Sequence, residues 1–140
     1  MSMFRGLDIS ASGLGVERTR MDIIAQNIAN VETTSDGGTP YRRKEVVLSS
    51  VPWTKSPAAN SEPTAGGVQV AQIREDTSPF QMVYRPQDPN ADGDGYVKLP
   101  NVNLPLEMVD MVAATRAYEA NAAALRANKE IIRKALDILR

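Results

Sequence analysis

From residue 104 onward, apolar side chains recur at alternating three- and four-residue steps for five heptads. The stripe consists of Leu104, Met108, Met111, Tyr118, Ala122, Leu125, Ile132, Leu136 and Leu139, with Thr115 and Lys129 as its polar members. This spacing keeps one face of a helix apolar, because helical side chains three and four residues apart are neighbours. The pattern predicts a helix over residues 103–140, about 50 Å long. Such a stripe is too long to be buried in a small globule, so it predicts a partner helix.

A second heptad pattern begins the chain. Its apolar members recur every seven residues, at Leu7, Leu14, Met21 and Ile28. The two patterns together predict helices over residues 1–31 and 103–140, paired as an antiparallel coiled coil. A helical hairpin that packs only on itself fits the same pattern, and this alternative stays open. Three glycines, Gly6, Gly13 and Gly15, each weaken the first helix by about 1 kcal/mol relative to alanine, so we expect packing to hold it.

The segment between the helices, residues 32–102, has a different character. Residues 41–51 and 67–73 have the composition and alternation of strands, and residues 80–84 and 96–99 are shorter candidates. Residues 52–66 are rich in Pro, Ser, Ala and Asn, which predicts a surface loop. The predicted fold is therefore mainly α with a small β insert, in which two terminal helices flank an irregular β-hairpin region.

Asparagines occupy unusual positions in both predicted helices. Asn27 and Asn30 lie near the end of the first helix, and Asn121 and Asn128 lie one heptad apart in the second. Asparagine disfavours helix interiors because its side chain competes for backbone hydrogen bonds. Helix termination explains Asn30 well and Asn27 poorly. We therefore expect these four amides to bond to a neighbouring chain and set its register.

Boundary signals place the start of the second helix. Asn103 is the predicted N-cap, since its side chain can accept a hydrogen bond from a free backbone N–H. Pro105 follows in the first turn, where its missing N–H is not needed.

Composition excludes several classes of function. The 140 residues suffice for one domain, and the formal net charge of −1 provides no cationic surface for nucleic acid. The chain has no cysteine and no histidine, which removes thiolate metal sites, the commonest metal ligand and the usual general base. The first 15 residues lack the pattern of a cleaved signal peptide, and no run of 18 apolar residues occurs. We predict no catalytic, metal-binding or cofactor-binding residues and no cofactor.

One acidic segment supports two weaker alternatives. Asp88, Asn90 and Asp92 have the spacing of the first ligands of a calcium loop, but Leu99 stands at position twelve, where a bidentate glutamate is required. A tight acidic turn explains the segment better than a calcium-binding module does. A hydrolase that uses Asp92 and Asp94 is the other alternative, and the missing histidine disfavours it.

Four separated blocks of sequence resemble one family. Residues 10–15 (SASGLG) and 21–30 (MDIIAQNIAN) resemble the N-terminal signature of flagellar axial proteins, which form the rod and hook. Residues 103–111 (NLPLEMVDM) and 116–121 (RAYEAN) resemble the matching C-terminal signature. Within that family, residues 33–44 and 88–97 resemble the proximal rod proteins.

The resemblance implies a structural subunit of the flagellar basal-body rod, not an enzyme. In this family the terminal helices pair along the core of a helical tube, and the middle region faces outward. The tube transmits torque from the motor to the hook and leaves a central export channel. The resemblance also implies export without a cleaved signal peptide through the type III apparatus, and assembly in the periplasm.

The resemblance further implies partners and contact residues. The implied partners are copies of the same chain, rod proteins of the FlgB, FlgF and FlgG types, the junction protein FliE and the membrane ring, with no nucleic acid and no membrane insertion. The residues expected to pack helices and subunits are the apolar stripe members Leu7, Leu14, Met21, Ile28, Met108, Met111, Tyr118, Leu125, Ile132 and Leu136.

Overall fold

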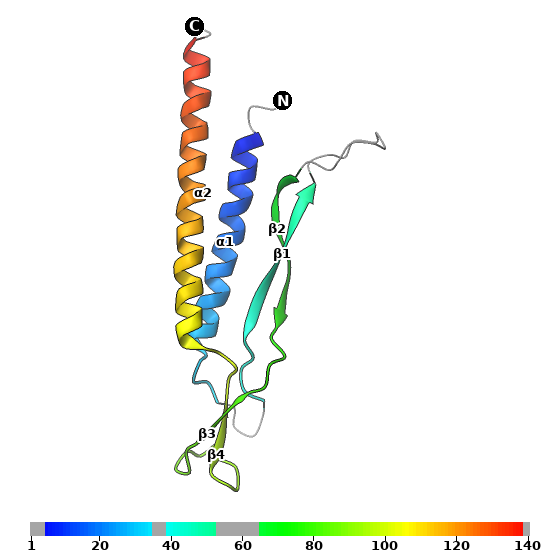
Figure 1. Ribbon diagram of the computed structural model, residues 1–140, viewed down its shortest axis with the longest axis vertical. Coiled ribbons are helices and arrows are strands. Elements are labelled where there is room, and N and C mark those ends of the chain that lie inside the picture. The colour runs from blue at the N-terminus through cyan, green and yellow to red at the C-terminus, as the bar shows by residue number, and fades with distance from the viewer. Residues whose placement is uncertain (1–4, 35–38, 53–64, 139–140) are drawn as a thin grey trace.

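The computed structural model describes residues 5–34, 39–52 and 65–138. Along the chain the elements are α1 (Arg5–Ala29), β1 (Lys44–Pro52), β2 (Ala65–Glu75), β3 (Gln81–Tyr84), β4 (Tyr96–Leu99) and α2 (Leu104–Ile138). The molecule is elongated, and α1 lies between α2 and the β1–β2 hairpin (Figure 1). The small β3–β4 hairpin lies at the end of the molecule opposite the two chain termini (Figure 1). Neither helix in the described ranges combines the length and apolar character that crossing a membrane requires.

The predicted pair of terminal helices is confirmed. Gly6 lies against Asn128 and Gly13 against Asn121, while the amide of Asn27 bonds to Glu107, so the contacts run in opposite chain directions. Two packed helices with a small β region between them match the predicted fold. The supercoiling that would make this pair a coiled coil stays a prediction.

The start of α2 follows the predicted boundary signals. Asn103 Oδ1 accepts a hydrogen bond from the backbone N–H of Leu106 at 3.2 Å, as an N-cap side chain does. Pro105 lies in the first turn of the helix. The end of α1 is closed by Asn30, whose Nδ2 donates to the carbonyl oxygen of Gln26 at 2.8 Å.

The four predicted strands are present as two antiparallel hairpins. In the first, β1 pairs with β2 from Lys44 opposite Glu75, with register shifts after Val47 and Val51. In the second, β3 pairs with β4 over four residue pairs. The predicted loop at 52–66 is corrected at its edges, because Pro52, Ala65 and Gly66 belong to strands. Residues 53–64 lie outside the described residues.

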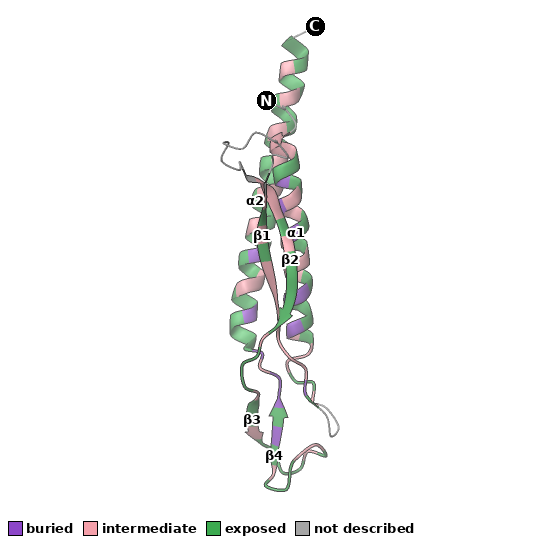
Figure 2. Ribbon diagram, turned by 90° about the vertical axis from the view of Figure 1, so that its right-hand side faces the viewer, coloured by how far each residue is buried: buried purple, intermediate pink, exposed green. Residues whose placement is uncertain are grey.

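The buried core lies where α1 ends and α2 begins. Ile23 and Ile24 of α1 are buried there, and Val97, Leu99 and Val102 are buried in β4 and the segment that leads into α2. Along the rest of α2 buried positions are few, and most of its surface is exposed (Figure 2). The core therefore ties the middle region to one end of the helix pair.

Candidate functional site

The contact between the helices, here called the seam, has a seven-residue repeat. In α1 the repeat falls on Gly6, Gly13, Arg20 and Asn27, and in α2 on Glu107, Ala114, Asn121 and Asn128. The two series give four pairs of facing residues, each called a level of the seam. Three of these pairs are in direct contact: Gly6 with Asn128, Gly13 with Asn121 and Asn27 with Glu107. The same register places Arg20 opposite Ala114, which is fully buried. The seam is thus formed largely by small and polar residues.

Two glycines of α1 make room for asparagine side chains of α2. A Cβ atom at Gly13 would lie 2.9 Å from Oδ1 of Asn121, and one at Gly6 would lie 2.9 Å from Nδ2 of Asn128. These distances are shorter than real Cβ contacts, so a larger residue at either position would require the asparagine side chain to move. Gly15 differs, because a Cβ atom there would meet nothing within 4 Å. Gly6 and Gly13 therefore set how closely, and at which level, α2 approaches α1.

Asn27 forms the last level of the seam and is 1% exposed. Its Nδ2 donates to the carbonyl oxygen of Lys44 at 2.8 Å and to Oε2 of Glu107 at 3.1 Å. Its Oδ1 accepts hydrogen bonds from the Lys44 N–H at 3.0 Å and from the Tyr41 hydroxyl at 2.9 Å. All four hydrogen-bonding positions of the amide are therefore used within the chain.

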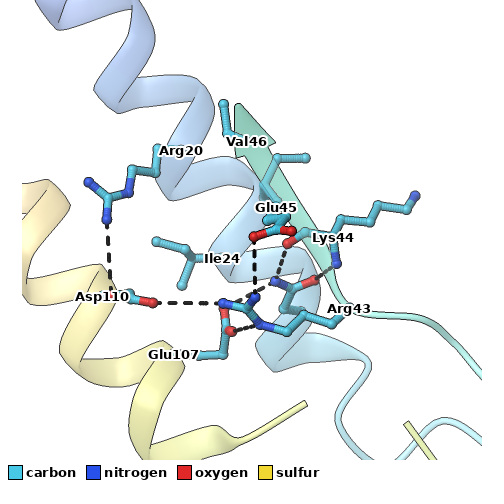
Figure 3. Close-up of a pocket in the computed structure, with 10 residues that line it drawn as sticks. Arg20, Ile24, Arg43, Lys44, Glu45, Val46, Glu107 and Asp110 are labelled. Atoms are coloured by element: carbon cyan, nitrogen blue, oxygen red, sulfur yellow. Dashed lines mark hydrogen bonds and ion pairs between the residues drawn. The ribbon is translucent and has the colours of Figure 1, made fainter. Parts of the chain in front are cut away.

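Arg43 lies near four carboxylates from three segments at this end of the molecule. Its Nε lies 2.6 Å from Oε1 of Glu107, which is fully buried, and its Nη2 lies 3.8 Å from Asp110 (Figure 3). Its Nη1 lies 3.9 Å from Glu45 and 3.8 Å from Asp76. One guanidinium thus joins the start of α2 to the open end of the β1–β2 hairpin, where Glu45 begins β1 and Asp76 follows β2. We call Asn27, Arg43 and Glu107 the polar hub.

Burial and charge at the polar hub raise the pKa values of Tyr41 and Arg43. Burial raises the pKa of the Tyr41 hydroxyl, and the negative charges of Glu107 and Glu75 raise it further. Burial acts to lower the pKa of Arg43, but its hydrogen bond to Glu107 and the surrounding carboxylates outweigh burial and raise that pKa. The guanidinium therefore stays charged and keeps the buried carboxylate paired. This arrangement serves to fix neighbouring segments relative to one another.

The four predicted asparagines occupy two kinds of place. Asn121 and Asn128 lie in the seam against glycines, between the helices of one chain. Asn27 bonds within its own chain, and Asn30 closes α1 and accepts a hydrogen bond from the Thr33 hydroxyl. The expectation that Asn27 bonds to a neighbouring chain is corrected, because its amide has no hydrogen-bonding position left for another molecule.

The apolar residues predicted in α1 lie beside the seam. Each follows a seam residue by one position, and all four are half-buried: Leu7, Leu14, Met21 and Ile28. In α2, Met108 lies one residue after Glu107, and Leu136 lies where the same repeat continues beyond the seam; each is 58% exposed. The Thr115 hydroxyl, at the same kind of position, lies 3.7 Å from the sulfur of Met21. These residues form one side of the helix pair, here called the side stripe.

The remaining predicted residues of α2 each lie four positions after a seam residue of the same helix. Met111, Leu125 and Ile132 are half-buried, while Tyr118 is 37% exposed. Partial burial of this kind leaves apolar surface for a second contact. Their expected role between subunits stays a prediction.

Large apolar side chains are exposed mainly on α2. Within the described residues α1 exposes Ile9, whereas α2 exposes Leu104, Leu106, Met108, Val109, Val112, Tyr118, Ile131, Leu136 and Ile138. Among elements, α2 packs on α1 alone, so most of its surface has no cover within the described residues. A long exposed apolar helix face is typical of a surface that another protein covers.

The acidic segment forms the predicted turn. Asp88 Oδ1 accepts a hydrogen bond from the backbone N–H of Asn90, and Asp92 Oδ1 accepts from those of Asp94 and Tyr96. Carboxylates that accept backbone N–H groups two residues ahead are typical of aspartate turns. These hydrogen bonds give both side chains a local structural role.

The sequence pattern did not identify Arg43 or Glu107 as important. Arg43 lies in a run of three basic residues, and Glu107 fits a favourable charge near a helix N-terminus. One signal was present, because Glu107 lies seven residues before Ala114 and continues the series of Asn121 and Asn128. A charged residue in a seam register requires a buried partner.

Comparisons with known proteins agree with this geometry. Residues 7–35 match the family model described as flagella basal body rod protein, and residues 94–138 match that of the flagellar basal body rod FlgEFG protein C-terminal region. The chain is 44% identical to the flagellar basal-body rod protein FlgC of Bacillus subtilis, with 99% of each chain covered. It is 42% identical to the protein of that name from Aquifex aeolicus (98% and 97% covered) and 38% identical to that from Salmonella typhimurium (99% and 98%).

Proposed function

Since the chain belongs to the FlgC family of flagellar basal-body rod proteins, we propose that its helix pair forms part of the wall of a helical tube. Membership of this family makes the chain a structural rod subunit that assembles with other rod components in the basal body. The family is not an enzyme family. The proposal concerns how the parts of this chain serve that assembly.

We propose that residues 1–31 and 103–140 form a core domain and that residues 32–102 face outward. In the core domain the two helices supercoil along the seam as an antiparallel coiled coil. The heptad spacing of the seam contacts supports this, since a strict seven-residue repeat favours a left-handed supercoil. The tube transmits torque from motor to hook and leaves a central channel for exported subunits.

The observation that carries the proposal is the exposed apolar surface of α2 together with the side stripe. The face of α2 is exposed and the side stripe is only partly buried within the described part of this chain, and burial of apolar surface is the main driving force for protein association. Copies that meet through two different surfaces build filaments or tubes, because such heterologous contacts do not close on themselves.

The remaining proposals concern delivery and neighbours. The chain passes unfolded through the type III export apparatus and assembles in the periplasm. Its neighbours in the basal body are rod proteins of the FlgB, FlgF and FlgG types, the junction protein FliE and the membrane ring. The exposed face of α2 supplies the surface on which such neighbours pack.

A substitution on the exposed face tests the proposal. Val109 is 65% exposed, so Val109→Asp leaves the fold of the isolated chain intact while placing a charge in the subunit contact. In cells that lack the native subunit, we expect the variant to be expressed but to give no motility and no rods in purified basal bodies. Gln87→Asp, an exposed change in the β3–β4 connection, is the matched control and should restore motility. Motile cells carrying Val109→Asp, or basal bodies that lack the unmodified chain, would overturn the proposal.

A further inference from the structure

Each helix carries an exposed row of residues on the side away from the seam. In α1 the row is Asp8, Ala11, Gly15, Arg18, Asp22, Ala25 and Ala29, and every member is exposed. Steps of three and four residues place these side chains along one line of the helix. Gly15 has open space around it, so the β1–β2 hairpin does not cover this line. We call it the α1 row.

The corresponding row of α2 has large apolar residues at one end and charges along its length. It consists of Val109, Val112, Arg116, Glu119, Ala123 and Arg126, all exposed, with Lys129 one turn further on. We call this the α2 row. Within the described residues, Arg18, Asp22, Arg116 and Glu119 take part in none of the ion pairs within the chain.

The charges of the two rows are complementary in antiparallel order. Along α1 the signs are negative at Asp8, positive at Arg18 and negative at Asp22, and backward along α2 they are positive at Lys129, negative at Glu119 and positive at Arg116. Asp8 and Arg18 are ten residues apart, as are Lys129 and Glu119. Arg18 and Asp22 are four residues apart, and their counterparts on α2 are three apart. The three signs are therefore complementary in one register, with the spacings equal to within one residue; Glu130, which lies beside Lys129, is the acidic exception.

Apolar and small residues fit the same register. Gly15 falls opposite Ala123, where two small residues let the helix backbones approach closely. Ala25 and Ala29 fall opposite Val112 and Val109, so large side chains meet small ones. At the level of Asp8 the basic residues Arg126, Lys129 and Arg133 outnumber the acidic Glu130. The match thus extends over most of α1.

Resting on the proposed function, we infer that the α1 row of one copy of this chain binds the α2 row of the next copy. Each copy presents both rows, so the contact is heterologous and repeats from copy to copy. In an antiparallel pair the numbers of two facing residues have a constant sum, which defines the register. This sum is 134 in the seam and 137 or 138 in the contact between copies. The difference of about three to four residues displaces neighbouring copies by about 5 Å along the helix axis. A row of such copies climbs as a helix.

Charge reversal with rescue tests this contact. Arg18→Glu and Glu119→Arg each place like charges opposite one another, and we expect each to abolish motility and remove this chain from purified basal bodies. The double variant restores opposite charges, so we expect motility to return to at least half of the wild-type swarm rate. Arg85→Glu, an exposed reversal in the β3–β4 connection, is the control and should have no effect. Failure of the double variant to assemble would overturn the pairing.

Cross-linking gives an independent readout, because the chain has no cysteine of its own. Chains with Arg18→Cys and chains with Glu119→Cys are co-expressed, and their basal bodies are purified and oxidised. We expect a disulfide-linked dimer that requires both variants and is absent when Arg85→Cys replaces Arg18→Cys. Without a dimer the inferred contact is wrong. A different result would contradict the proposed function, namely that the unmodified chain is absent from purified basal bodies.

Discussion

The two ends of the helix pair hold the same seam by different means. At one end, here called the terminal end, Gly6 and Gly13 accommodate Asn128 and Asn121 by close approach alone. At the other, the connector end, the polar hub joins α1 to α2 by charge and hydrogen bonds. At the connector end Arg43 also joins α2 to the β region, whereas at the terminal end the hairpin contacts α1, where the Val68 N–H donates to Ser12 Oγ at 3.2 Å, and α2 extends past the start of α1 (Figure 1).

This difference indicates that the connector end is folded by the chain itself and that the terminal end depends on assembly. Buried apolar residues and the fully buried Glu107 cluster near the polar hub. Toward the terminal end, large side chains such as Ile131 and Ile138 are 63% and 85% exposed. Local stability follows buried contacts, so we expect the helix pair to open first at the terminal end.

Substitution of Arg43 should have the largest effect on stability and should remove the difference between the two ends of the helix pair. Arg43→Ala leaves Glu107 buried without a cationic partner, which typically costs about 3–5 kcal/mol. We expect this loss in the free energy of unfolding, measured with urea and followed by circular dichroism.

The control for Arg43 is another arginine that pairs with a glutamate. Arg74 forms an ion pair with Glu45, but its side chain is 59% exposed. Exposed ion pairs contribute about 0–1 kcal/mol, so Arg74→Ala should change stability little. Equal losses in the two variants would show that the polar hub does not stabilise the connector end.

Two glycines that are two residues apart sharpen the comparison at the terminal end. Gly15→Ala should stabilise α1 by about 1 kcal/mol, because alanine favours helix and the site has open space. Gly13→Ala brings the same gain in helix propensity but forces a methyl group against Asn121, and overpacking costs about 1–3 kcal/mol. We expect the two variants to differ by about that amount in urea unfolding.

A double variant identifies the cause of that difference. Asn121→Ala removes the side chain that a Cβ at residue 13 would meet. Gly13→Ala should therefore be better tolerated in the Asn121→Ala background than in the wild type. If Gly13→Ala behaves like Gly15→Ala in both backgrounds, the close approach of the helices does not depend on glycine.

Local signals predicted most of the fold. The helix over 103–140 was recognisable because its period is sustained and Asn103 and Pro105 mark its start, and β4 was predicted at its observed bounds. Each of these features depends on neighbours in sequence. The strand ends at Pro52 and Ala65 were missed, because pairing across a hairpin extends strands into residues that favour loops.

The contacts between distant segments could not be predicted in the same way. All three glycines of α1 look alike as helix-weakening residues, and only the position of Asn121 distinguishes Gly13 from Gly15. The polar hub joins residues 80 positions apart in one hydrogen bond, and no local pattern encodes that pairing. The apolar stripe was recognised, but its division between seam and side stripe depends on the rotation of each helix about its axis.

The smallest predicted effect concerns Tyr41, whose hydroxyl donates to Asn27 at the connector end. Tyr41→Phe removes this hydrogen bond and should cost about 0.5–1.5 kcal/mol near neutral pH.

Burial, with the charges of Glu107 and Glu75, raises the pKa of Tyr41, so the folded state favours the neutral hydroxyl. Its contribution is complete below the ordinary tyrosine pKa of about 10 and is lost as pH rises through the raised value. The stability difference between wild type and Tyr41→Phe should therefore shrink at alkaline pH. The other tyrosines titrate in both proteins, so their effects cancel in the comparison. A difference that stays constant up to the highest pH at which both proteins fold would show that folding does not raise the pKa of Tyr41.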